Sequence, residues 1–203
     1  IMEKFLHSVI LERDYCNGCT YCLDRCPTQA IRVRDCKAEI MTERCIDCGM
    51  CIKVCPYHAK GAQSDSLEML KKFKYNVALP AISIYGQFGL EYDMNKVLNG
   101  FYQLGFDFVF DVAYAADLIT QIQKKRVEED GHVKPLISVY CPAVIRLIQM
   151  RFPTLIDHIS QLESPSEVAA RIARKKIEEM TGLAQEDIGV FYLTECPAKI
   201  TSI

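Results

Sequence analysis

A duplicated run of cysteines constrains this chain more than any other feature of its sequence. The segment CNGCTYCLDRCP (16–27) has the spacing C-x2-C-x2-C-x3-C-P, and CIDCGMCIKVCP (45–56) repeats it. Three cysteines separated by two residues each can hold three corners of a cubane [4Fe–4S] cluster in one tight loop. The fourth cannot bend back as sharply and ligates the other cluster. The repeat therefore predicts two clusters with crossed ligand sets.

The spacing assigns four thiolates to each predicted cluster. The set for cluster 1 is Cys16, Cys19, Cys22 and Cys55, and the set for cluster 2 is Cys45, Cys48, Cys51 and Cys26. Zinc and disulfide bonds are the alternatives. Zinc motifs usually leave a longer gap between cysteine pairs, and the ordinary globular composition after residue 60 does not suit a secreted disulfide framework. Cys36 lies outside the spacing, and we interpret it as a free thiol.

Residues 8–60 resemble a two-cluster bacterial ferredoxin domain, including the CPTQAI ending of the first half (26–31). The resemblance implies an α+β ferredoxin-like fold, and we place this domain at 1–62. Short strands are expected at 9–11, 30–33 and 38–41. Because about 60 residues build only a thin core, metal ligation should supply much of the folding free energy.

The polar segment KGAQSDS (60–66) is the expected domain boundary, and 63–203 is predicted to be an α/β lobe with a mainly parallel sheet. Expected strands and helices alternate: strands at 76–79, 107–112, 135–140 and 189–194, and helices at 94–105, 115–130, 142–152 and 163–182. In the last helix Ser164 is the predicted N-cap, Glu167 completes a capping box and Gly182 ends the helix.

Two isolated cysteines lie in this lobe, each where an expected strand ends. Cys141 precedes Pro142, and Cys196 precedes Pro197. Because ligands collect at the carboxyl ends of parallel strands, the two thiols are candidate metal ligands. The alternative is that both are ordinary core cysteines.

Residues 66–203 resemble the first lobe of the catalytic domain of [FeFe]-hydrogenases, which carries their H-cluster. The resemblance rests on LPAISIYGQFG (79–89), VLNGFYQLGFDFVFDVAYAADL (97–118), PLISVYCPAVIRLIQMRFPTLIDHIS (135–160) and TECPAK (194–199). It implies that Cys141 and Cys196 ligate the [4Fe–4S] part of the H-cluster, a third cluster in this chain. It also implies that Lys199 contacts a cyanide of the di-iron subsite.

The sequence departs from this family at several positions. Tyr140 replaces the cysteine that relays protons, and a phenol with a reference pKa of about 10 exchanges protons poorly near neutrality. Thr194 and Glu195 replace the Met-Pro that precedes the second ligand. The motif that supplies the last two cysteine ligands is absent, so residues outside this chain would have to complete the third cluster. We therefore expect the chain to be a fragment.

These features predict an electron-transfer segment of an [FeFe]-hydrogenase-like redox or hydrogen sensor, and not an enzyme by itself. The alternatives are a fragment of a catalytic [FeFe]-hydrogenase-type oxidoreductase, and an electron-transfer or cluster-assembly protein without hydrogen chemistry. Expected partners are a redox protein, a downstream signalling domain and a second copy of the chain in a homodimer. A net charge of −2 without long basic runs argues against nucleic acid. The apolar stretch 75–90 is too short and broken to span a bilayer, and we expect the protein in the reducing cytoplasm.

Overall fold

The computed structural model describes residues 7–89, 91–129 and 133–202. Their contacts form two compact units. The first unit combines the chain up to Ser64 with residues 137–160 and 196–203, and the second combines residues 65–136 with 161–195. The predicted division between residues 62 and 63 stays a prediction, because the contacts group two later segments with the N-terminal part.

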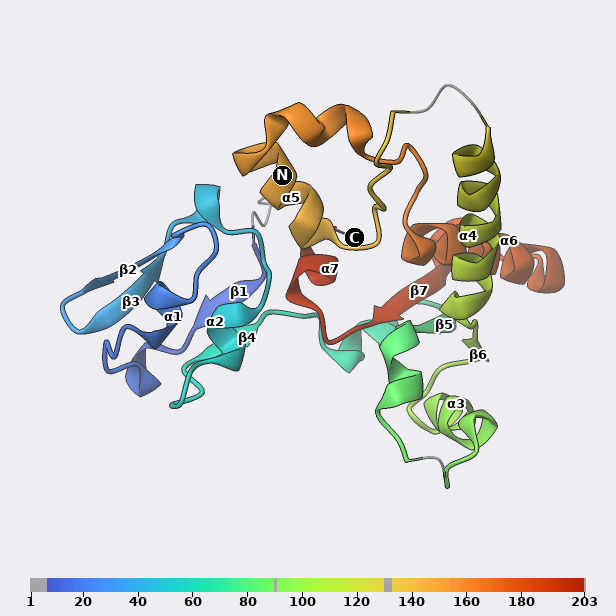
Figure 1. The fold of residues 1–203 in the computed structure, drawn as a ribbon. Helices are drawn as coiled ribbons and strands as arrows, with labels where there is room; N and C mark the ends of the chain where they lie inside the picture. The colour runs from blue at the N-terminus through green and yellow to red at the C-terminus, as the bar shows by residue number, and fades with distance from the viewer. Residues whose placement is uncertain (1–6, 90, 130–132, 203) are drawn as a thin grey trace. The chain divides into compact units, whose positions relative to one another are not determined.

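The ferredoxin-like part of the first unit contains two small antiparallel sheets and two one-turn helices (Figure 1). Strands β1 (Val9–Leu11) and β4 (Lys60–Ala62) form one sheet, and β2 (Ile31–Arg34) and β3 (Lys37–Ile40) form the other. The helices are α1 (Tyr21–Asp24) and α2 (Met50–Lys53). The expected strands are confirmed to within a residue or two.

The first unit also contains α5 (Pro142–Arg151), α7 (Pro197–Ser202) and the short helical segment Pro153–His158 between residues 137 and 160. Helices α5 and α7 pack against each other. The expected helix at 142–152 is confirmed. The expected strand at 135–140 is wrong: Ile137 forms one isolated bridge with Ile159, and a turn follows. With a partner at only one position, the β-branched run cannot extend into a ladder. Cys141 therefore does not follow a sheet strand.

The second unit is built on the parallel sheet β6-β5-β7. Its strands are β5 (Tyr75–Pro80), β6 (Phe108–Val109) and β7 (Ile188–Leu193), and its helices are α3 (Met94–Gln103), α4 (Val112–Glu128) and α6 (Pro165–Thr181). The core is a cluster of nine buried side chains from strands and helices: Val77, Leu79, Phe110, Val112, Ala115, Ala169, Ala173, Ile177 and Ile188. Central β5 is buried along most of its length, as expected for a strand paired on both edges.

Local sequence signals set the helix ends of this unit. In α6 the Ser164 side chain accepts the N–H of Glu167, and the Glu167 carboxylate accepts the N–H of Ser164. Gly182 ends the helix at φ +70°, as the sequence predicts. The strand expected at 107–112 is shorter than predicted, because the Asp111 carboxylate accepts the N–H of Ala113 and starts α4. The expected end of that helix at residue 130 lies outside the described residues.

A tyrosine–carboxylate hydrogen bond in this unit gives a pH-dependent prediction. The Tyr85 hydroxyl donates to Asp111, and burial, followed by this bond, raises the pKa of Tyr85 to about 12. The folded pKa lies above the unfolded value of about 10. The contribution of the Tyr85 hydroxyl to the free energy of unfolding is therefore complete below pH 10 and is lost as the pH rises toward 12. Tyr85→Phe should cost about 1 kcal/mol in urea unfolding at pH 7. The difference in the free energy of unfolding between this variant and wild type should decrease above pH 10. A difference that does not change with pH would contradict the role given to the Tyr85 hydroxyl.

The helices in the described ranges include none whose length and apolar character would suit a bilayer-spanning segment.

Candidate iron–sulfur centres

The first of two cysteine-lined hollows holds the thiols predicted for cluster 1. It contains about 340 Å³ of space between protein atoms, partly open to solvent. Its lining includes all four predicted ligands: Cys16, Cys19, Cys22 and Cys55. Cys16 and Cys19 lie in the loop that leads into α1, Cys22 lies in α1 itself, and Cys55 comes from the second motif. Four thiols around one hollow are the donor set that a [4Fe–4S] cluster requires.

The second hollow is the counterpart for cluster 2 and contains about 350 Å³. Its lining likewise includes the four predicted ligands: Cys26, Cys45, Cys48 and Cys51. The structure thus brings together both crossed sets that the spacing predicts. The assignment of individual ligands stays a prediction, and the residues fit it.

Backbone N–H groups donate hydrogen bonds to the sulfur atoms of Cys16, Cys26 and Cys55. Ala38 donates to Cys16 Sγ at 3.4 Å, Ala30 to Cys26 Sγ at 3.2 Å and Ala59 to Cys55 Sγ at 3.3 Å. The last two come from the same place in the duplicated sequence, four residues after each crossing cysteine. Hydrogen bonds to cluster sulfur atoms influence reduction potentials, so these amides form part of the site.

Burial sets the ionisation of several of these thiols. It raises the pKa of Cys45 to about 11 and that of Cys51 to about 12. Burial also raises the pKa of Cys22 and Cys48. At Cys16 burial opposes ionisation, but the N–H groups of Ala38 and Gly18, with Lys60 and Lys37, lower the pKa. Since thiolate is the ligand form, iron binding must displace protons from most of these positions.

Gly18 in the first cysteine loop gives a prediction about cluster loading. Its φ is +76°, and an added Cβ would lie 2.8 Å from the carbonyl carbon of Cys36. In Gly18→Ala the left-handed backbone conformation should therefore cost roughly 1–2 kcal/mol, and the added Cβ should also clash with the backbone of Cys36. Iron content after anaerobic reconstitution should fall from about eight to about four atoms per chain.

Gly49→Ala is the matched control for this substitution. Gly49 has φ +72°, but its added Cβ would meet only the Pro197 side chain, at 3.4 Å. The conformational cost is similar and the backbone clash is absent, so Gly49→Ala should retain more iron. Equal iron contents in the two variants would contradict the role given to the Cys36 backbone.

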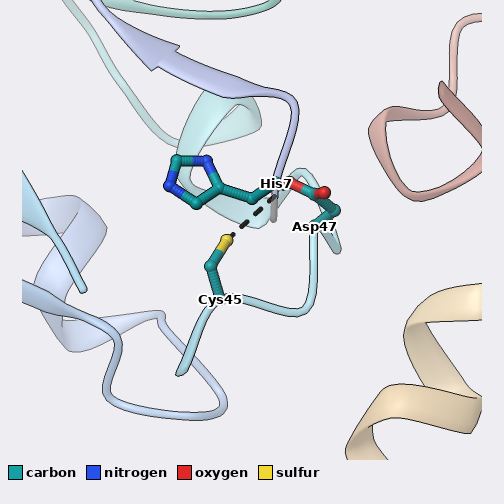
Figure 2. Close-up of side chains that lie close together, drawn as sticks. All are labelled: His7, Cys45 and Asp47. Atoms are coloured by element: carbon teal, nitrogen blue, oxygen red, sulfur yellow. Dashed lines mark hydrogen bonds between the residues drawn. The ribbon is translucent and has the colours of Figure 1, made fainter. Parts of the chain in front are cut away.

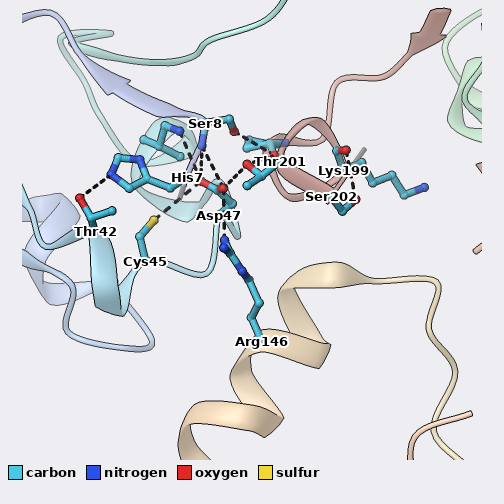
Figure 3. A network of polar contacts seen from close by, with 11 residues as sticks. His7, Ser8, Thr42, Cys45, Asp47, Arg146, Lys199, Thr201 and Ser202 are labelled. Atoms are coloured by element: carbon cyan, nitrogen blue, oxygen red, sulfur yellow. Dashed lines mark hydrogen bonds and ion pairs between the residues drawn. The ribbon is translucent and has the colours of Figure 1, made fainter. Parts of the chain in front are cut away.

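A buried carboxylate, Asp47, lies in the sequence between the predicted ligands Cys45 and Cys48 and lines the hollow of cluster 2. Figure 3 shows its polar contacts. It is 1% exposed and accepts the backbone N–H groups of Ser8 and Val9 at 3.0 to 3.3 Å. The Thr201 hydroxyl of α7 donates to it, and Arg146 Nη1 of α5 lies 3.6 Å away. Asp47 thus joins β1, α5 and α7 around one charge.

His7, Cys45 and Asp47 place potential ligand atoms within 4.8 Å of one another (Figure 2). Cys45 is a predicted ligand of cluster 2, so a separate metal ion would compete with that cluster for its thiol. The Asp47 oxygen atoms already accept hydrogen bonds from several donors. We therefore interpret the group as the surroundings of cluster 2. Sequence reasoning did not single out His7 or Asp47; the available signal was that Asp47 stands where the first motif has Gly18.

The remaining sequence-predicted residues lie in or next to the later segments of the first unit. Cys141 is exposed and immediately precedes α5, and Cys196 is half-buried and immediately precedes α7. Tyr140 is half-buried in the turn before Cys141. Lys199 lies on α7, and Figure 3 shows its side chain directed away from Asp47. The structure brings both cysteines into the compact unit of the ferredoxin-like part.

Comparison with known proteins gives two family matches. The family described as "Iron only hydrogenase large subunit, C-terminal domain" matches residues 74–201, and the "4Fe-4S dicluster domain" matches residues 8–56. The chain belongs to the iron-only hydrogenase family, and it carries the dicluster domain in front. Eight of the nine cysteines between residues 16 and 55, those of the two repeated motifs, support two [4Fe–4S] clusters.

Similar proteins include a subunit of an NADP-reducing hydrogenase from Solidesulfovibrio fructosivorans, which is 24% identical over 226 residues. That alignment covers 95% of this chain and 39% of the relative. Iron hydrogenase 1 from Clostridium pasteurianum is 24% identical over 108 residues, which is 51% of this chain and 19% of the relative. A solved [FeFe]-hydrogenase structure has a similar fold, with a TM-score of 0.53 and 23% identity over 67% of this chain and 39% of its own. The chain spans well under half the length of these relatives.

Proposed function

We propose that this chain is the iron–sulfur electron-transfer segment of an [FeFe]-hydrogenase-like redox or hydrogen sensor in a reducing cytoplasm. The observation that carries electron transfer is the grouping of eight cysteines into two four-thiol hollows. When bound there, [4Fe–4S] clusters supply one-electron transfer. A redox protein would be the external partner, and a signalling domain or a second copy of the chain would receive the response.

Contacts within the first compact unit support an order of the clusters along the electron path. Gly49 lines the hollow of cluster 2, and it lies against Pro197, which directly follows Cys196. Helix α7 after Cys196 packs against α5 after Cys141. Cluster 2 would therefore be the neighbour of a third cluster at Cys141 and Cys196, completed by residues outside this chain.

Tyr140 favours sensing over turnover. It stands where the resemblance places the proton-relay cysteine, and a phenol is a weaker proton carrier near pH 7 than a thiol. A site that accepts electrons but exchanges protons slowly can report a redox state without rapid hydrogen chemistry. Lys199 is the observation that favours the catalytic alternative, because the resemblance places it beside the di-iron subsite.

Infrared spectroscopy of the maturated native protein separates the two functions. A sensor without the di-iron subsite should show no CO or CN bands, and hydrogen evolution should stay at background with a reduced donor. CO and CN bands together with hydrogen turnover at hydrogenase rates would reject the sensor and favour the enzyme.

Anaerobic reconstitution tests the electron-transfer part independently. The chain should bind about eight iron atoms and show two one-electron reductions. A colourless chain without iron would reject this proposal, and also the alternative of an electron-transfer or cluster-assembly protein without hydrogen chemistry.

A further inference from the structure

Lys60 is a buried cation that the electron-transfer assignment does not yet explain. Its side chain is 5% exposed, and its Nζ has no hydrogen-bond partner among the described residues. It belongs to β4, opposite Leu11 of β1, and lines the hollow of cluster 1. An unpaired ammonium in a protein interior is costly unless an opposite charge accompanies it.

The hollow itself supplies that opposite charge once a cluster is present. Four thiolates around an oxidised [4Fe–4S] core form a dianion, and around a reduced core they form a trianion. A nearby ammonium therefore stabilises the reduced form more than the oxidised form. Lys60 lines the same hollow as Cys16 and Cys22, two of the predicted ligands of cluster 1.

The duplicated sequence contains a matched uncharged position. CPTQAI (26–31) and CPYHAK (55–60) align residue by residue, so Ile31 stands in the first half where Lys60 stands in the second. Ile31 is 2% exposed and lines the hollow of cluster 2. Each hollow therefore has one buried side chain from this position, cationic at cluster 1 and apolar at cluster 2.

Asp47 adds to this difference in charge between the two hollows, because it makes the surroundings of cluster 2 more negative. Its carboxylate lines the hollow of cluster 2, whereas the equivalent position at cluster 1 is Gly18. Arg146 and several hydrogen-bond donors offset much of the Asp47 charge. The larger part of the difference in charge between the two hollows is therefore assigned to Lys60.

We infer that Lys60 raises the reduction potential of cluster 1 above that of cluster 2, so that the first electron from a one-electron donor resides on cluster 1. In this step one core is reduced from its 2+ to its 1+ state, and no bond forms or breaks. The inference rests on the proposed electron-transfer function and adds an order of reduction to it. Lys60 lines the hollow of cluster 1 and is not among the residues that line the hollow of cluster 2, so a smaller shift in the same direction is expected at cluster 2.

The test is an anaerobic potentiometric titration of the reconstituted chain with dithionite, followed by electron paramagnetic resonance. Lys60→Met removes the charge and keeps an unbranched stem, and Lys60→Arg keeps the charge. Lys60→Met should make the equilibrium constant of the first reduction about tenfold smaller. For a one-electron couple this lowers the midpoint potential by about 59 mV. Lys60→Arg should stay near wild type. An unchanged first midpoint in fully loaded Lys60→Met would overturn the inference.

Ile31→Lys places a cation at the matched position and should raise the midpoint of the second reduction, narrowing the gap between the two. This variant also decides the case if Lys60→Met fails to bind iron. A loaded Ile31→Lys chain with both midpoints unchanged would show that a lysine at this position does not act on its cluster. Failure of wild type to bind iron would reject the proposed function instead, so the two failures are distinguishable.

Discussion

Removing iron from the reconstituted chain with a chelator should unfold the ferredoxin-like part and leave the parallel sheet of the second unit folded. The reason is the difference between their hydrophobic cores. Among the residues that the structure describes, the buried cluster of the ferredoxin-like part consists of Cys22, Ile31 and Ala38, and several of the side chains packed against it are predicted ligands. The core of the second unit contains nine buried side chains and no cysteine.

The thiols make the metal-free state still less favourable for the ferredoxin-like part. Without iron the buried thiols are protonated at neutral pH, since burial raises the pKa of Cys51 to about 12. Two hollows of about 340 and 350 Å³ also lose the group that fills them. Structural metal sites in small domains supply on the order of 10 kcal/mol, which exceeds what so thin a core contributes.

Hydrogen exchange read peptide by peptide is the measurement for this prediction. After chelation, peptides from β1 to β4 should lose their protection, and peptides from β5, α4 and α6 should keep it. Cys36→Ser is the matched control, because Cys36 is exposed and lies outside both ligand sets; its exchange pattern should equal that of wild type. Protection of the β1–β4 sheet that survives complete iron removal would contradict the argument.

The sequence predicts most of what local chemistry decides. The grouping of the cysteines around the two hollows follows from spacing, because a tight loop of three cysteines leaves the fourth to cross over. The α6 ends follow from Ser164, Glu167 and Gly182, whose signals lie within the helix itself. The parallel direction of β5, β6 and β7 follows from the alternation of strands and helices, but their order in the sheet does not.

What the sequence does not predict depends on contacts between distant segments. The run at 135–140 has a strand-like composition, but only its Ile137 has a strand partner, and periodicity cannot reveal a missing neighbour. Asp47 looks like an ordinary loop carboxylate until Thr201 is found beside it, 154 positions away. Lys60 looks like a surface lysine, although comparison with Ile31 in the repeated half would have marked it.

Asp47→Ala is expected to destabilise the first compact unit by about 3–5 kcal/mol, the range for removing one partner of a buried charged group. The carboxylate is 1% exposed, whereas the Arg146 side chain is 32% exposed and can turn toward water. The larger loss is therefore at the N–H groups of Ser8 and Val9, which would have no acceptor in a buried setting. Loss of the Thr201 bond also removes one of the hydrogen bonds that hold α7 in the first unit.

Arg146→Met separates the ion pair from the hydrogen bonds. It removes the cation but leaves Asp47 with its backbone and hydroxyl donors, so the expected cost is smaller than that of Asp47→Ala. Glu179→Ala breaks an exposed pair in α6, where Glu179 lies 3.9 Å from Lys175, and should cost at most about 0.5 kcal/mol. We therefore predict that the loss in free energy of unfolding decreases in the order Asp47→Ala, Arg146→Met, Glu179→Ala. Urea unfolding of the iron-loaded protein measures this loss.

Hydrogen exchange should locate the effect of Asp47→Ala. Because Asp47 contacts β1, α5 and α7 at once, α5 and α7 should exchange faster together, while the β6-β5-β7 sheet keeps its wild-type protection. Ser8 Oγ also donates to the carbonyl of Pro197 at 2.9 Å, and this bond alone cannot replace the charged acceptor. If α5 and α7 keep full protection in an iron-loaded Asp47→Ala chain, apolar packing of these helices holds them in place and the carboxylate does not.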